Sequence, residues 1–177
     1  MKRGFTLIEL IVVIAIIAIL AAIIAPNAFK AIEKAKTTKL IGDMKALKTA
    51  TLAYYSDMGF WPADVCPDDD PGFTQQQAYN VRTGGAPACL SSGQYPTNWQ
   101  AILSQSWDGP YLDKWPLLNP WGGSYDYENW PGSGIWISAR GVSAGARQQL
   151  VASSIAGKFP FTLQDNGGVL QILICPQ

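Results

Sequence analysis

The chain contains no histidine among its 177 residues. This absence excludes Ser-His-Asp and Cys-His catalytic groups, histidine-ligated zinc, and the usual acid–base group of enzymes at neutral pH. Carboxylate chemistry is not excluded, but the sequence has no phosphate-binding glycine loop, no zinc-type cysteine spacing and no supported carboxylate pair. We therefore expect a protein that is not an enzyme.

Charged side chains make up only 15% of the chain, and they are unevenly distributed. Residues 1–55 contain eight Lys or Arg against three acidic residues, whereas residues 56–177 contain five against ten. Because the acidic part is the globular part, nucleic-acid binding is not expected. The basic part of one copy could instead attract the acidic part of another, with a strength that depends on ionic strength.

No charged or strongly polar side chain occurs from Leu10 to Ala25. A helix over residues 5–25 would be about 31 Å long, close to the thickness of the hydrocarbon core of a bilayer. Glu9 is unusual in such a helix, because inserting an ionised acid into a membrane costs roughly 2.5–3.5 kcal/mol of free energy. A cleaved secretory signal does not fit so early an acid, and a plain membrane anchor fits the length but gives Glu9 no role.

A third interpretation comes from a resemblance. Residues 4–9, GFTLIE, stand between a short basic leader and a long apolar stretch, and they resemble the class III leader of type IV pilins and type II secretion pseudopilins. The resemblance implies that a prepilin peptidase cleaves after Gly4 and methylates the new N-terminus at Phe5. It also implies that Glu9 pairs with the α-amino group of Phe5 on a neighbouring subunit, which would set the register of a filament. The implied assembly residues are Phe5, Thr6 and Glu9.

The lysines around the apolar segment favour a topology in which the head stays in the cytoplasm. Two basic residues precede the segment, and four lysines follow it at positions 30, 34, 36 and 39. The positive-inside rule alone would keep the remainder of the chain in the cytoplasm. The leader motif and the cysteine usage both imply an exported head, and we give them more weight. We expect a single-pass protein of the bacterial inner membrane whose head enters a periplasmic pseudopilus or an extracellular pilus.

Beyond the apolar segment, Pro26 should kink the helix or melt it locally. An amphipathic helix should then continue to Met58 and end at Gly59 and Pro62. Its apolar positions share one stripe that should pack against the head: Phe29, Ile32, Leu40, Met44, Leu47, Tyr54 and Met58.

The expected organisation has four parts. These are a leader peptide at residues 1–4, a transmembrane or filament-core helix at 5–25, an amphipathic half-helix at 26–58, and a globular head at 59–177 with a loop insertion at about 63–96. A head of this size is large enough for a single hydrophobic core.

The loop insertion contains the candidate disulfide and metal residues. Cys66 and Cys89 lie near its two ends, so a bridge between them would close it, and Cys175 is the alternative partner. The run Asp68, Asp69 and Asp70 could bind calcium through its oxygens, although such a run is more often a solvated loop.

The remainder of the head predicts an α+β fold. A short helix is expected over Thr97–Gln105, with Thr97 as its cap and three side chains facing inward, those of Trp99, Ile102 and Leu103. Two alternating runs, Tyr125/Tyr127 and Ile135/Ile137, flank a Pro-Gly-Ser-Gly turn and predict a β-hairpin. A short helix at Gln148–Ala156, a turn at Asp165–Gly168 and a last strand at Val169–Cys175 should follow.

The GPYL segment at 109–112, the PWG turn at 120–122 and the Y-x-Y strand at 125–127 resemble the head of the major pseudopilin of type II secretion. The end of the long helix, residues 58–62, is also similar. In that family a calcium-binding loop rich in glycine and aspartate follows the second strand. Residues 139–147 of this chain contain two arginines and no acid, so no cofactor is expected at this place. The C-terminal cysteine resembles type IV pilins instead.

The resemblance implies a pilin-like fold and a structural filament subunit, with a type II secretion pseudopilin that drives protein export as the first choice. Implied partners are other copies in a helical filament, minor pilins, the prepilin peptidase and an inner-membrane assembly platform. One alternative is the pilin of a surface pilus for adhesion, twitching motility or DNA uptake. A second is a membrane-anchored module that binds glycans or proteins through exposed tryptophans, although we expect most of the seven tryptophans in the core.

Overall fold

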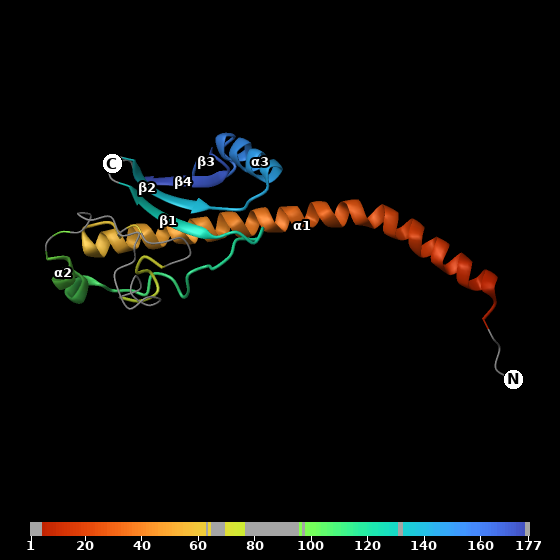
Figure 1. Cartoon of the computed structure of the whole chain (residues 1–177), viewed down its shortest axis with the longest axis horizontal. Coiled ribbons are helices and arrows are strands. Elements are labelled where there is room, and N and C mark those ends of the chain that lie inside the picture. Colours follow the sequence, from red (N-terminus) through yellow and green to blue (C-terminus); the bar gives the residue numbers. More distant parts are fainter. Residues whose placement is uncertain are drawn as a thin grey trace. The chain divides into compact units, whose positions relative to one another are not determined.

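The computed structural model describes residues 5–62, 64, 70–76, 96, 98–130 and 133–175, with only the backbone described at Gln100 and Trp130. The chain divides into two compact units, residues 1–38 and residues 39–177. The elements, labelled in Figure 1, are α1 (Leu7–Met58), α2 (Trp99–Ser106), β1 (Tyr125–Trp130), β2 (Gly134–Ala139), α3 (Ala144–Ile155), β3 (Leu163–Asn166) and β4 (Val169–Cys175).

In the first unit, the described residues form the N-terminal part of α1. This part is long and apolar enough to cross a membrane, by length and composition. Helix continues on both sides of Pro26, so the local melting that we considered at this residue is wrong. Within this unit, the red part of the ribbon is curved (Figure 1). A proline inside a helix removes one backbone hydrogen bond and is a known cause of bending.

The apolar stripe of α1 is confirmed only in the second unit. Leu40, Met44 and Leu47 are fully buried there, and Tyr54 and Met58 are nearly so. The prediction that Phe29 and Ile32 pack against the head was wrong. Both residues lie in the first unit, with 68% and 51% of their surface exposed. They have the helical spacing of the stripe, but neither joins the core of the second unit. The helix ends as expected, since Gly59 has a φ of 72° and its N–H donates to the carbonyl of Tyr55.

A four-stranded antiparallel sheet with the order β1-β2-β4-β3 forms the head together with the second half of α1. The predicted hairpin is confirmed, with Tyr127 opposite Ile137 in the β1–β2 register. The last strand, β4, is also confirmed and pairs with both β2 and β3. β3 was not predicted, because it is only four residues long and Leu163 is its one buried residue.

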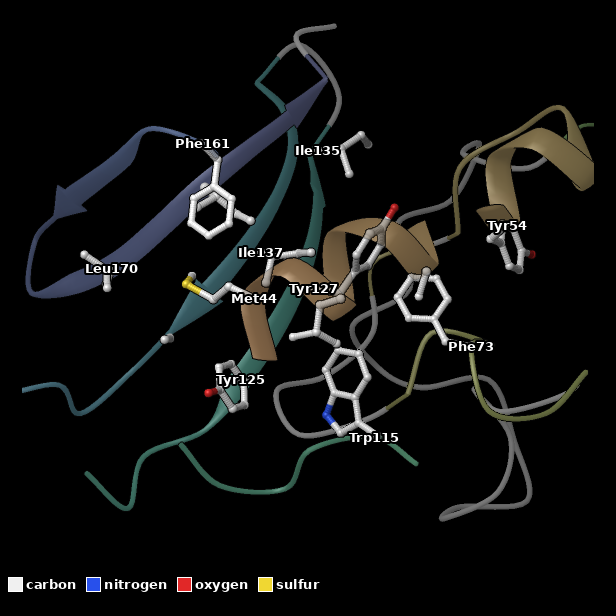
Figure 2. Packing of buried hydrophobic residues seen from close by; sticks show 14 of the residues in the cluster. Met44, Tyr54, Phe73, Trp115, Tyr125, Tyr127, Ile135, Ile137, Phe161 and Leu170 are labelled. Atoms are coloured by element: carbon white, nitrogen blue, oxygen red, sulfur yellow. The ribbon is translucent and has the colours of Figure 1, made fainter. Parts of the chain in front are cut away.

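The core of the head lies where the inner face of this sheet meets α1. Figure 2 shows Tyr125 and Tyr127 of β1, Ile135 and Ile137 of β2, and Leu170 of β4 around Met44 of the helix; all six side chains are fully buried. The alternation of these positions along each strand places the intervening side chains on the opposite face of the sheet. The same alternation therefore builds the core and leaves a second, polar face.

Both short helices begin elsewhere than expected. The N-cap of α2 is Asn98 and not Thr97, which lies outside the described residues. α3 begins at Ala144, four residues before the predicted start at Gln148, and Ser143 is its N-cap. Its first turn is Ala-Gly-Ala-Arg, in which small side chains give no apolar period to recognise.

Most tryptophans belong to the core, as expected. Trp115 is buried, and four others pack against the core with part of their surface exposed: Trp61, Trp99, Trp107 and Trp121. Trp136 is partly exposed. This distribution disfavours a broad aromatic surface for glycans on the part of the head that the structure describes.

The residues of the loop insertion are described only in part. Cys66, Cys89, Asp68 and Asp69 lie outside the described residues, so the disulfide and most of the calcium run stay predictions. Asp70 is described, and its carboxylate accepts hydrogen bonds from the backbone N–H groups of residues 72, 73 and 74 and from the Thr74 hydroxyl. Asp70 therefore shapes a local turn, and Phe73 after it is fully buried against Tyr54 and Tyr127 (Figure 2).

Candidate assembly site

The start of α1 brings Thr6 and Glu9 together. Thr6 donates two hydrogen bonds to Oε2 of Glu9, from its backbone N–H at 2.8 Å and from its hydroxyl at 2.7 Å. The backbone N–H of Glu9 donates in return to the Thr6 hydroxyl oxygen at 3.3 Å. Since α1 begins at Leu7, Thr6 is the N-cap and Glu9 is at the third helical position, which makes this pair a capping box.

The capping box supplies hydrogen bonds to the Glu9 carboxylate but no positive charge. Among the described residues no Lys or Arg side chain forms an ion pair with Glu9, and the residue is exposed. A second group with a positive charge could therefore still approach it. Gly4, the predicted cleavage site, lies outside the described residues, so the processing site stays a prediction.

Exposed apolar side chains surround this pair. Phe5 is 82% exposed, and every large apolar side chain of residues 7–24 has about half or more of its surface exposed in the single chain. A surface of this kind is stable only when lipid or other protein covers it. The first unit is therefore built for an environment that the single chain does not supply.

The outer face of the sheet carries a polar network that sequence reasoning missed. Asp126 on β1 is nearly buried and accepts a hydrogen bond from Nη2 of Arg140 at 2.8 Å. Glu128, two residues further on, accepts from the Ser138 hydroxyl at 2.7 Å and from the Gln171 amide at 3.1 Å. The network therefore ties three strands together through side chains, and β-strand alternation on both sides of Tyr127 was the available signal.

Asp64 lies near this network and is 6% exposed. Burial, together with the negative charges of Asp126 and Glu128, raises the pKa of Asp64 to about 7. No group of three metal-ligating side chains occurs in the part of the chain that the structure describes. Asp64 is therefore a buried carboxyl beside this network, with a pKa near neutral pH.

The PWG turn is held by Asn119, whose role sequence reasoning also missed. The Asn119 side-chain amide donates to the carbonyl of Arg140 at 2.6 Å, and its oxygen accepts from the Trp121 N–H at 2.9 Å. Gly123 is required at the same place, because a Cβ there would lie 2.0 Å from the Arg140 carbonyl oxygen. The turn is thereby pinned to the end of β2.

The two arginines of residues 139–147 both bind carboxylates. Arg140 binds Asp126, and Nε of Arg147 donates to Oδ2 of Asp165 at 2.9 Å. Arg147 also donates to the carbonyl of Val142. The expectation that no calcium site follows the second strand remains a prediction, and these contacts show what the arginines do in the structure.

An apolar groove of about 510 Å³ lies between α1 and the segment 112–118 in the second unit. Leu117 and Leu118 at this groove are 67% and 61% exposed. Among the described residues nothing accepts a hydrogen bond from the buried indole N–H of Trp115, which also lines the groove. In Figure 2 this nitrogen lies at the end of the ring that points away from Tyr127 and Phe73.

Comparisons with known proteins agree with this arrangement. Residues 1–25 match a family model described as the prokaryotic N-terminal methylation motif, and residues 31–85 match one described as PilW, C-terminal. The chain is 36% identical over 126 residues to the type II secretion system core protein G of Pseudomonas aeruginosa. The aligned region covers 70% of this chain and 71% of that protein. No solved structure matches the chain significantly. With a prepilin-type N-terminus, a long helix packed on a small antiparallel sheet, and this identity over 70% of its length, the chain belongs to the superfamily of type IV pilins and type II secretion pseudopilins.

Proposed function

We propose that this pilin-like subunit is a type II secretion pseudopilin, whose assembly into a filament drives protein export. The observation that carries the proposal is the 36% identity to a type II secretion core protein, because it extends well beyond the N-terminal motif into the head. The GPYL, PWG and Y-x-Y segments of the head support the same choice over a surface pilin. The long helix and the small head support a subunit whose helix lies in the filament core and whose head forms the outer surface.

The proposed assembly begins with removal of residues 1–4 by a prepilin peptidase, which leaves a methylated amino group on Phe5. A cationic amino group in an apolar helix bundle needs a negative partner. Two unit charges about 4 Å apart attract with roughly 4 kcal/mol at an effective dielectric constant of 20. Glu9 of the neighbouring copy is the proposed partner, so that the pair selects one axial register over others.

The capping box suggests different roles for Thr6 and Glu9. Thr6 holds the Glu9 carboxylate through Oε2 at 2.7–2.8 Å, and no described residue hydrogen-bonds the second carboxylate oxygen, which a neighbour could bind. Thr6 is therefore proposed as a positioning residue and Glu9 as the residue that binds the amino group. The other proposed partners are minor pilins and an inner-membrane assembly platform.

The test compares Glu9→Gln with Thr6→Ala in the native host. Gln at the third helical position can still form a capping box, so Glu9→Gln removes the charge and keeps the start of the helix. Thr6→Ala removes the cap, which costs about 0.5–2 kcal/mol, and keeps the charge. We expect Glu9→Gln to reduce filament yield at least tenfold and Thr6→Ala to reduce it less, as counted on negatively stained sheared filaments.

Mass spectrometry of the native N-terminus is the control for both variants. A product that begins at methylated Phe5 shows that processing is intact and that the defect lies in assembly. Filaments of Glu9→Gln at wild-type yield would refute the proposed pairing. A wild-type product that retains Met1 would refute prepilin processing itself.

A surface pilus is the second candidate, because the last strand ends on a cysteine in the manner of type IV pilins. Imaging of native cells separates the two candidates. Long external fibres that contain this chain would favour the surface pilus, whereas filaments confined to the periplasm would favour the pseudopilus. We do not propose glycan binding, because the described tryptophan side chains are mostly packed in the core.

A further inference from the structure

The segment just beyond the apolar run, residues 28–36, has an apolar side and a basic side. Phe29 and Ile32 are three residues apart and therefore share one side of the helix, and both are more than half exposed. Lys30 and Lys34 are four residues apart and share another side. We call residues 28–36 the girdle. It has the composition of helices that lie at the boundary between acyl chains and headgroups.

The two lysines of the basic side are available to a ligand. Lys36 forms an ion pair with Glu33 at 3.4 Å, and Lys39 forms one with Asp43 at 2.7 Å. Within the described part of the chain, Lys30 and Lys34 form no ion pair, and both residues are exposed. The girdle therefore presents, on one side of a helix, two charges that no described residue pairs with.

Helix geometry places these charges near lipid phosphates. With the apolar run in the hydrocarbon layer and its end at Ala25, Lys30 lies about 7 Å and Lys34 about 13 Å further along the helix axis. A headgroup layer is about 5–8 Å thick on each side of the bilayer core, and a lysine side chain can bend back toward it. Both ammonium groups can therefore reach phosphate oxygens from the exported side.

We propose that Lys30 and Lys34 bind the phosphate groups of anionic phospholipids in the outer leaflet of the inner membrane, while Phe29 and Ile32 contact the acyl boundary. The inference rests on the membrane-anchored stage of the proposed function. It gives a reason for two of the four lysines on the exported side of the span, where the positive-inside rule does not place them. The lipid contacts hold the subunit at one depth, and they must be released when it enters a filament.

The test uses the full-length chain in lipid nanodiscs that contain equal amounts of phosphatidylglycerol and phosphatidylcholine. Native mass spectrometry after release from the nanodiscs counts the lipids of each kind that remain bound. A lysine near an anionic surface contributes a factor of about five, so Lys30→Gln and Lys34→Gln should each lower the enrichment of phosphatidylglycerol about fivefold. In 0.5 M salt the wild-type enrichment should also fall.

A matched control is Lys45→Gln with Lys48→Gln, which changes the net charge equally in the second unit. This control should keep the wild-type enrichment, and Lys30→Arg with Lys34→Arg should keep it as well. An unchanged enrichment in the Lys30→Gln/Lys34→Gln variant would overturn the proposal, and so would an equal loss in the control. Because unassembled subunits are measured, this result does not depend on whether filaments form.

Discussion

Arg147 holds the corner at which α3 meets the β3–β4 turn, and its removal should destabilise the head measurably. The side chain links Val142 before α3 to Asp165 in β3, through the Val142 carbonyl and through Oδ2 of Asp165 at 2.9 Å. Val142 is 2% exposed, and its carbonyl is partly buried where Arg147 reaches it. Arg147→Ala would leave this carbonyl and the Asp165 carboxylate without their shared partner.

The magnitude follows from the exposure of the groups. The side chains of Arg147 and Asp165 are 18% and 32% exposed, so their ion pair should contribute near the upper end of the range of about 0.2–1 kcal/mol measured for exposed pairs. A hydrogen bond from a charged donor contributes about 1.5–3 kcal/mol. We expect Arg147→Ala to lower the free energy of unfolding by about 2–3 kcal/mol, which lowers the midpoint of thermal unfolding by about 6–12 °C for a head of this size.

The assay is thermal unfolding of the full-length chain in detergent, followed by tryptophan fluorescence. Asp165→Asn is the informative second variant, because its amide oxygen can still accept from the Gly168 N–H, which now donates to Asp165 at 3.1 Å. It should cost only about 0.5–1 kcal/mol, and 0.5 M salt should shrink that difference. An Arg147→Ala midpoint within about 2 °C of wild type would refute the reasoning.

Three further predictions concern the head. The folded-state pKa of Asp64, about 7, lies above its ordinary value of 3.8, so its contribution to stability is full at low pH and is lost as pH rises through 7. The stability of Asp64→Asn relative to wild type should therefore rise by about 1–2 kcal/mol between pH 5 and pH 8 in urea titrations, after allowance for solvent screening, and an unchanged difference would contradict the shift. Phe73→Ala should lower the free energy of unfolding by about 3–5 kcal/mol in the same titrations, because Phe73 is fully buried against Tyr54, Trp115 and Tyr127. A loss below about 1 kcal/mol would show that residues 70–76 are not part of the core. Added calcium or EDTA should move the wild-type unfolding midpoint by less than about 1 °C, since arginines bind the carboxylates beside the second strand. If EDTA lowered the midpoint by several degrees and calcium restored it, the chain would have a metal site.

The elements predicted correctly are those whose signal is local. The end of α1 follows from Gly59, which has a positive φ just after the helix, and the β1–β2 hairpin follows from alternation around a Pro-Gly-Ser-Gly turn. The start of α3 and the whole of β3 were missed, because Ala and Gly conceal a helical period and a four-residue strand is too short to show alternation.

The candidate sites divide in the same way. Residues 4–9 predict the candidate assembly site, because the peptidase motif consists of consecutive residues. The roles of Asn119 and Arg140 depend on partners in other segments of the fold. The Asn119 side chain, for example, contacts the carbonyl of Arg140, about twenty residues further along the chain. No single residue pattern indicates such contacts.

The sequence by itself determined that the chain is a prepilin-type subunit with a membrane-length helix and an α+β head, because leader motif, apolar length and strand alternation are properties of consecutive residues. Only the tertiary structure decided how far the apolar stripe is used. Helical spacing continues from Phe29 to Met58, yet burial begins at Leu40, because a stripe becomes core only where another surface covers it. It also decided that Thr6 hydrogen-bonds Glu9 at the three-dimensional start of α1, where no described Lys or Arg side chain forms an ion pair with the Glu9 carboxylate.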